Sequence, residues 1–143
     1  MTEVRHVVVA DPELRERSRM TELLRGPAEE LGLTLEVHQA TDGKSALALI
    51  EQHKPALVLT EVLLEGISGL SMLRRLRGSM PADKVPPFVF VTTMARESDR
   101  YWGLRNGAHG YVMKPYEDDL LQSRIRDVLR AGGELMPEKL GLL

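Results

Sequence analysis

The sequence has no cysteine, no long apolar run and almost no net charge, and each absence excludes a class of protein. Zero cysteines exclude a disulfide framework, zinc–thiolate centres and thiol catalysis. Apolar stretches reach only a few residues before a charge interrupts them, and the first residues lack a signal-peptide pattern. A net charge of −2 supplies no cationic field for nucleic acid. We therefore expect a cytoplasmic protein with no direct nucleic-acid or membrane partner.

The residues that are present suffice for one folded domain. With 43% hydrophobic residues in a chain of 143, the protein can bury a core of ordinary size. The four histidines do not follow a metal-ligand spacing in the sequence, and we assign them no role. They are His6, His38, His53 and His109.

Five short segments have the composition of β-strands. Most are β-branched or nearly continuous apolar runs, typical of strands that are covered on both faces, and one alternates apolar with polar residues. These segments are residues 4–10, 33–40, 55–60, 88–91 and 109–113.

Helical periodicity fills the intervals between these strands. In the first interval, apolar residues such as Met20 and Leu23 recur at helical spacing until Gly26-Pro27 interrupts the helix, and a second piece then extends to Gly32. Asp42 lies where an N-cap of the next helix is expected. Strict alternation of five strands and five helices predicts an α/β fold: a five-stranded parallel sheet, doubly wound as (βα)5, with flavodoxin-like topology.

Four polar residues follow or end strands of this predicted sheet. Asp11, Glu61, Thr92 and Lys114 come at the carboxyl ends of the first, third, fourth and fifth strands. Ligands of open α/β sheets collect at that edge, so we expect the four side chains to converge. Two carboxylates, a hydroxyl and an ammonium could hold Mg²⁺ and a phosphoryl group.

The order and spacing of several motifs resemble a known family. The segments are VVVADPELR at 7–15, PALVLTEVLLEGISGL at 55–70, Val91-Thr92 and GAHGYVMKPY at 107–116. Together they resemble the receiver domain of bacterial two-component response regulators over residues 4–131. The resemblance implies the receiver variety of the predicted fold and a role in signal transduction.

The resemblance also implies roles for individual residues. In that family the residue ending the third strand is the aspartate that accepts phosphate from a histidine kinase, and here Glu61 occupies that position. Thr92 matches the hydroxyl that responds to phosphorylation, Tyr111 the aromatic switch and Lys114 the cation beside the phosphate. The resemblance alone favours a cis peptide bond between Lys114 and Pro115, because X–Pro bonds in general are cis in only about 5–6% of cases.

Two departures from the family pattern weaken the expectation of phosphorylation. The pair of adjacent acids after the first strand is reduced to Ala10-Asp11, so Asp11 remains as a metal ligand or as a helix cap. We expect no cofactor, with Mg²⁺ bound weakly if at all. Glu61 carries an extra methylene, and a misplacement of about 1 Å can cost on the order of 100-fold in an in-line transfer. We expect Glu61 to form an ion pair with Lys114 and to mimic a phosphate in part, with about one negative charge where a phosphate carries about 1.5 to 2.

These features support two main functions. The first is a pseudo-receiver that is not an enzyme and is not conventionally phosphorylated. It would contact a histidine kinase or a downstream effector through its fourth helix, fifth strand and fifth helix, where Tyr101 and Trp102 could anchor a partner. The second is a working response regulator with Mg²⁺-dependent phosphorylation and dephosphorylation.

Further alternatives stay open at this point. An unrelated α/β enzyme or cofactor binder would need a glycine-rich loop after the first strand, and Asp11-Pro12-Glu13 is not one. The chain could also be the receiver part of a longer DNA-binding regulator, and it could act as a monomer or a homodimer. We place the receiver domain at residues 1–133 and an apolar C-terminal tail at residues 134–143, which could fray, pack back or contact a partner.

Overall fold

The protein folds around one five-stranded parallel sheet with the strand order β2-β1-β3-β4-β5. This computed structural model describes residues 3–131. The strands are β1 (Glu3–Ala10), β2 (Leu33–Ala40), β3 (Leu57–Thr60), β4 (Phe88–Thr92) and β5 (Gly110–Met113). This arrangement confirms the predicted fold class. The predicted domain end at residue 133 and the tail at 134–143 lie outside the described residues.

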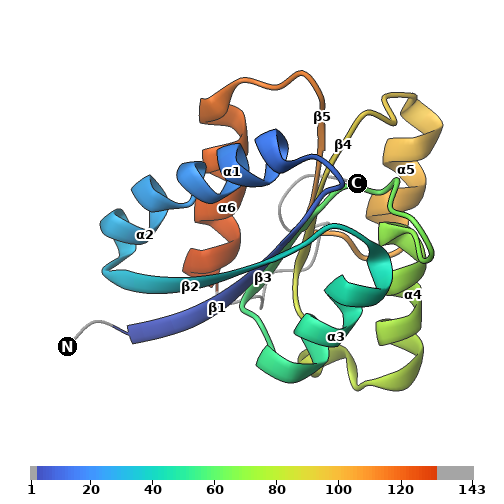
Figure 1. The fold of residues 1–143 in the computed structure, drawn as a ribbon, viewed down its shortest axis with the longest axis horizontal. Coiled ribbons are helices and arrows are strands. Elements are labelled where there is room, and N and C mark those ends of the chain that lie inside the picture. Colours follow the sequence, from blue (N-terminus) through green and yellow to red (C-terminus); the bar gives the residue numbers. More distant parts are fainter. Residues whose placement is uncertain (1–2, 132–143) are drawn as a thin grey trace.

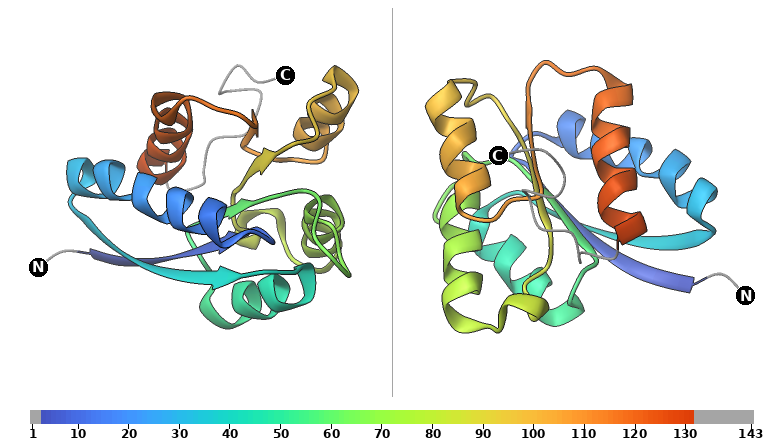
Figure 2. Two further views of the ribbon diagram at one scale, coloured as in Figure 1. Left: turned by 45° about the horizontal axis from the view of Figure 1, so that its top comes forward. Right: turned by 180° about the vertical axis from the view of Figure 1, so that it is seen from behind.

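Helices cover both faces of the sheet (Figures 1 and 2). One layer consists of α1 (Leu14–Leu23), α2 (Arg25–Leu31) and α6 (Asp118–Ala131). The other consists of α3 (Gly43–His53), α4 (Gly69–Ser79) and α5 (Glu97–Arg105), and a short 3₁₀ helix, Ala82–Lys84, precedes β4. Within residues 3–131, no helix combines the length and the apolar character that spanning a membrane requires.

The two helical layers enclose two hydrophobic cores, and β1 shows why. Its side chains alternate between the faces of the sheet, so Val7 and Val9 join the core under α1 and α6, whereas Val8 and Ala10 join the core under α3 and α4. All residues of β3 and β4 are buried. The continuous apolar runs predicted for strands covered on both faces are therefore confirmed.

The first crossover differs in detail from the prediction. The helix is divided at Leu24, not at Gly26-Pro27, and Pro27 lies within the first turn of α2. A proline is tolerated there because a first-turn N–H has no intrahelical acceptor. Gly32 ends α2 in the left-handed region, with φ of 67°. Since α1 and α2 together fill one interval, the predicted fourth and fifth helices are α5 and α6.

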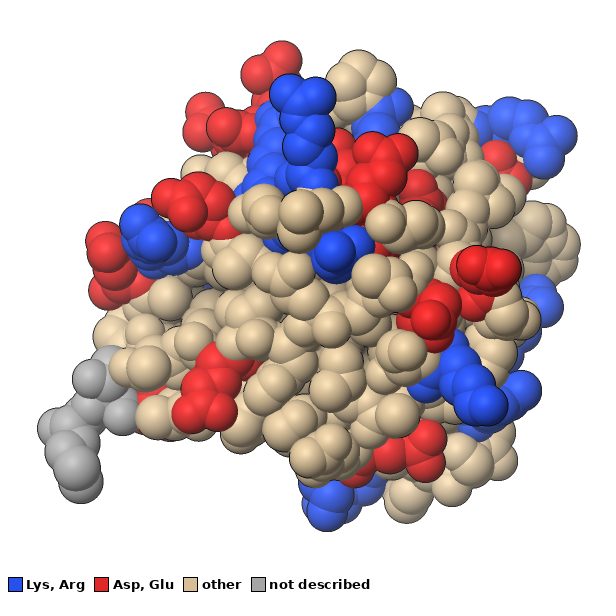
Figure 3. Space-filling view, viewed as in Figure 1, with Lys and Arg blue, Asp and Glu red and all other residues tan. Residues whose placement is uncertain are grey.

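The face in Figure 3 carries acidic and basic side chains interspersed with uncharged ones. This mixture agrees with the net charge of −2. No single-sign field of the kind that draws in a polyanion covers this face.

Candidate functional site

The predicted polar residues meet at the carboxyl edge of the sheet. Lys114 Nζ lies 2.7 Å from Asp11 Oδ2 and 3.3 Å from Glu61 Oε1. The Asp11 and Glu61 side chains are 2% and 5% exposed, and that of Lys114 is 13% exposed. The expected ion pair between Glu61 and Lys114 is present, and Lys114 makes its shorter contact with Asp11.

Backbone amides hold the Glu61 carboxylate in place. The N–H of Leu63 donates to Oε2 at 3.0 Å, and the N–H of Thr93 donates to Oε1 at 3.2 Å. Burial raises the pKa of Glu61, but the Thr92 hydroxyl, these amides and the Lys114 ammonium together outweigh burial and lower it. Glu61 is therefore an ionised carboxylate surrounded by donors on several sides.

The same contacts keep Lys114 charged. Burial lowers the pKa of the ammonium, and the hydrogen bond and charge of Asp11, with the charge of Glu61, raise it above its usual value. Because the ammonium lies between two buried carboxylates, its charge is compensated inside the fold.

Both side-chain oxygens of Asp11 accept hydrogen bonds from within the chain. Its Oδ2 accepts from Lys114, and its Oδ1 accepts from the N–H of Glu13 at 2.9 Å. Glu13 is the N-cap residue of α1, so Asp11 stabilises the turn into the helix and does not cap it.

The pocket offers few free oxygens to a cation. Each carboxylate already accepts at least two hydrogen bonds, and the side chain of Ala10 has no ligand atom. No third acidic side chain within residues 3–131 lies close enough to Asp11 and Glu61 to complete a three-ligand group. Since Mg²⁺ requires near-ideal octahedral oxygen coordination, a metal here would depend mostly on water.

The loop after β3 brings the first residue of α4 close to the backbone of Glu61. It turns at Gly66, whose φ of 81° lies in the left-handed region, and returns so that Gly69 N–H donates to Val62 O at 2.8 Å. A Cβ at Gly69 would lie 2.7 Å from Glu61 O. The absence of a side chain at Gly69 therefore permits α4 to start against the backbone of the pocket.

Tyr111 points into the fold. It is 9% exposed, and its hydroxyl donates to Met94 O at 2.8 Å. Burial, followed by the charges of Asp99 and Glu61, raises the pKa of Tyr111 to about 12. The ring packs beside Phe90, and a Cβ at Gly103 would lie 2.7 Å from it. The residue that the resemblance matches to the aromatic switch is thus packed against the core in this structure.

The two predicted partner-binding aromatics lie outside the pocket. Tyr101 and Trp102 on α5 are 51% and 54% exposed. Trp102 also lines a separate cavity of about 280 Å³ with residues of α4, including Leu70 and Arg74.

The Lys114–Pro115 peptide bond is cis, as the resemblance implied.

The structure brings three of the four histidines close together, which their spacing along the sequence does not indicate. His6, His38 and His53 come from three different elements and bring their ring nitrogens within 4.8 Å of one another. Spacing along the sequence does not reveal this proximity, because parallel strand pairing and a crossover helix bring distant positions together.

Comparison with known proteins agrees with the fold and the motif order. The model of the response regulator receiver domain matches residues 7–126. PilH of Pseudomonas aeruginosa is 29% identical over 123 residues, which are 86% of this chain and 96% of PilH. The transcriptional regulatory protein AfsQ1 of Streptomyces coelicolor is 37% identical over 108 residues, 73% of this chain and 46% of AfsQ1. The chain thus spans about half the length of AfsQ1.

Solved structures share the same architecture. The signal receiver domain of NarL from Mycobacterium tuberculosis superposes with a TM-score of 0.72 at 22% identity, covering 93% of this chain and 99% of that one. The chemotaxis response regulator CheY4 of Vibrio cholerae superposes with a TM-score of 0.67 at 20% identity, covering 87% and 98%. At these identities the similarity establishes the fold.

Proposed function

Because this chain belongs to the response regulator receiver family, we propose that it is a signalling module in which the Glu61 carboxylate replaces the phosphorylated aspartate. It does not accept a phosphoryl group. It communicates through contacts with other proteins.

The observation that carries this proposal is the set of donors around Glu61. The amides of Leu63 and Thr93, the ammonium of Lys114 and the hydroxyl of Thr92 all act on one carboxylate. A cation, a hydroxyl and two amides are groups that bind phosphate oxygens well. In this chain the Glu61 carboxylate already interacts with these groups.

The same geometry opposes phosphoryl transfer. An accepting carboxylate must present an oxygen to an incoming phosphorus atom in line with the leaving group. Both Glu61 oxygens accept hydrogen bonds, and the side chain is 5% exposed. Attack would have to displace at least one of these donors, and each Asp11 oxygen that could recruit Mg²⁺ already accepts a hydrogen bond.

The output surface is the second part of the proposal. Receiver domains of response regulators interact with histidine kinases and effectors, and here the exposed Trp102 and Tyr101 lie on α5, which contacts β5. Their rings meet edge to face with centroids 5.3 Å apart. Exposed aromatic pairs are frequent anchors in protein interfaces. We place the partner-binding surface on α5, β5 and α6, with Trp102 as its anchor.

The Tyr111 hydroxyl connects the pocket to that surface. It donates to Met94 O, and the amide of Met94 donates to the Thr92 hydroxyl at 3.1 Å. The charge of Glu61 is therefore linked through Thr92 and Met94 to the ring that packs beneath α5.

The test is the intact mass of the protein after incubation with a small-molecule phosphodonor and Mg²⁺. We expect no adduct on the wild type and none on Glu61→Gln. The variant Glu61→Asp shortens the side chain, and combining it with Ala10→Asp adds the missing carboxylate. We expect the double variant to gain one phosphoryl group.

The residue that carries the adduct distinguishes the proposed pseudo-receiver from a working response regulator. A wild-type adduct on the peptide that contains Glu61 would show a working response regulator and overturn the proposal. An adduct on a distant side chain that persists in Glu61→Gln would leave the pocket unmodified and agree with it.

A further inference from the structure

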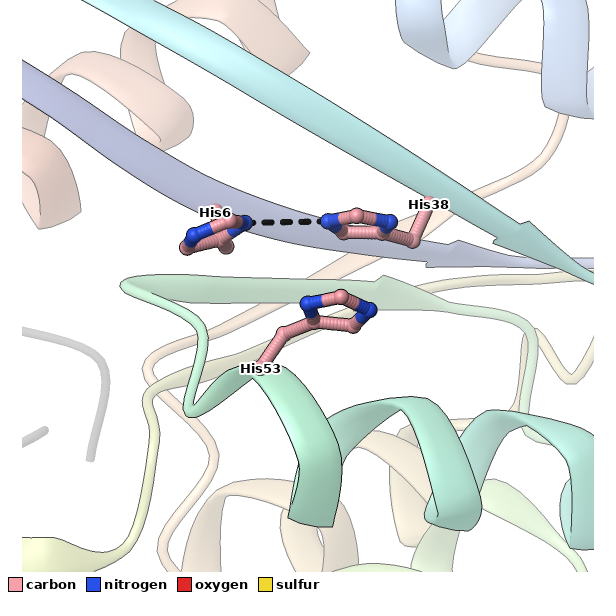
Figure 4. Close-up of side chains that lie close together, drawn as sticks. All are labelled: His6, His38 and His53. Carbon is pink, nitrogen blue, oxygen red and sulfur yellow. Dashed lines mark hydrogen bonds between the residues drawn. The ribbon is translucent and has the colours of Figure 1, made fainter.

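Three histidines form a cluster on the face of the sheet that α3 covers, outside the pocket (Figure 4). His6 lies on β1, His38 on β2, and His53 is the last residue of α3. In the register of β1 and β2, Val8 pairs with His38 and His6 pairs with Glu36. His6 and His38 are therefore diagonal neighbours on the face that α3 covers. Ala10 is four residue steps along β1 from His6, about 13 Å at 3.3 Å per step.

The ring nitrogens are already close together. His6 Nδ1 and His38 Nε2 share a hydrogen bond of 3.0 Å, and one ring nitrogen from each of the three residues lies within 4.8 Å of the others. The rings of His38 and His53 stack with centroids 3.6 Å apart. All three residues are partly buried. In the described part of the chain this is the only group of three or more such side chains at this separation.

We propose that His6, His38 and His53 form a binding site for a divalent first-row transition-metal ion, with Zn²⁺ as its reference ligand. Imidazole nitrogens bind Zn²⁺ at about 2.0–2.1 Å, which separates neighbouring nitrogens of a tetrahedral site by about 3.3 Å. The separation between His6 and His38 is near that value.

Binding requires a limited rearrangement of side chains. The planes of His38 and His53 are 11° apart, and the lone pair of an imidazole lies in its ring plane. One of these two rings must therefore turn before both can face one ion. Partial exposure gives them room, and the χ2 angle of histidine has a broad energy minimum.

The charges around the cluster favour a cation. Glu36 Oε2 lies 3.5 Å from His6 Nδ1, so it can supply a fourth ligand, an oxygen. The chain has no cysteine whose thiolate would compete for the ion.

A bound ion would join three elements that are far apart in the sequence. It would fix the edge strand β2 and the C-terminal end of α3 to β1. This inference does not depend on the proposed function of the Glu61 pocket, because the cluster contains none of the pocket residues.

The experiment is a zinc titration of the full chain without an affinity tag, in competition with a chromophoric chelator. We expect one Zn²⁺ per chain. The variant His53→Ala removes one ligand while alanine maintains the helix, and we expect zinc affinity to fall by at least about 100-fold, because losing even an outer-shell partner costs about 10–100-fold. Gln52→Ala, an exposed neighbour on α3, is the matched control and should bind as the wild type does.

Two further measurements separate the loss of a metal ligand from a loss of folding. Far-UV circular dichroism of the metal-free variants verifies that they are folded, and Zn²⁺ should raise the melting temperature of the wild type but not of His53→Ala. Glu61→Gln should retain the site, since its pocket lies elsewhere. No zinc uptake by the wild type, or equal affinity in the wild type and a folded His53→Ala, would overturn the proposal. The three rings would then be a packing arrangement only.

Discussion

Replacing Lys114 with methionine tests the electrostatic balance of the pocket. The ammonium lies 2.7 Å from Asp11 and 3.3 Å from Glu61, and both carboxylates are nearly inaccessible to solvent. Methionine keeps most of the volume of the side chain and removes its charge. Two buried anions are then left beside each other with no cation between them.

The expected loss follows from that burial. Removing one partner of a buried ion pair costs about 3–5 kcal/mol, because the remaining charge is desolvated without compensation. The amides of Leu63 and Thr93 still bind Glu61, and the amide of Glu13 still binds Asp11, which favours the lower part of this range. For a domain of this size the melting temperature should fall by about 10–15 °C at neutral pH.

The pH dependence distinguishes this cause from lost packing. The folded-state pKa of Glu61 is lowered in the wild type, so its contribution is present above the unfolded value of about 4.5 and is lost as pH falls through the folded value. In Lys114→Met, loss of the cation raises the pKa of Glu61 above its wild-type value, so protonation of Glu61 relieves the repulsion.

Urea unfolding of the wild type and of Lys114→Met, at pH 8 and at pH 5, measures the loss of stability and its dependence on pH. The difference in unfolding free energy between wild type and variant should shrink at the lower pH. Adding Asp11→Asn to Lys114→Met should recover part of the loss. A loss below about 1 kcal/mol, or one independent of pH, would refute the electrostatic reasoning.

Two other substitutions probe the path from the pocket to the surface. Tyr111→Phe removes the hydroxyl that donates to Met94 O, and we expect it to lower the free energy of unfolding by about 1 kcal/mol in denaturant titration; no change would show that water replaces the bond at no cost. Trp102→Ala should leave the stability within about 0.5 kcal/mol, because the side chain is 54% exposed, and should weaken partner capture several-fold. Wild-type affinity in Trp102→Ala would place the partner-binding surface elsewhere.

The strands were predictable because burial leaves a simple pattern. Val58 and Leu59 belong to an uninterrupted apolar run of the length that is typical of a strand covered on both faces. Ligands of open α/β sheets collect at the carboxyl ends of the strands, and this predicted that four polar side chains meet there: Asp11, Glu61, Thr92 and Lys114. The break at Leu24 was missed because Pro27 looked like a stop signal, and a proline in the first turn of a helix is not one.

Contacts that depend on backbone position were not predictable. The amides of Leu63 and Thr93 belong to loops, and their identity as donors to Glu61 follows from loop geometry and not from side-chain type. The histidine cluster depends on the β1–β2 register and on where α3 ends. One clue was present in the sequence: His53, near the expected end of a helix, lies on the same crossover that follows His38.

The phosphorylation state of the wild-type pocket tests the central claim most directly. The measurement is peptide mass analysis of the segment containing Glu61, after exposure of the unaltered chain to a phosphodonor with excess Mg²⁺ under conditions that preserve acyl phosphates. Our account predicts an unmodified peptide, because both oxygens of Glu61 already accept hydrogen bonds from the groups that would receive a phosphoryl group. A phosphoryl group on that peptide at Glu61 would contradict the account.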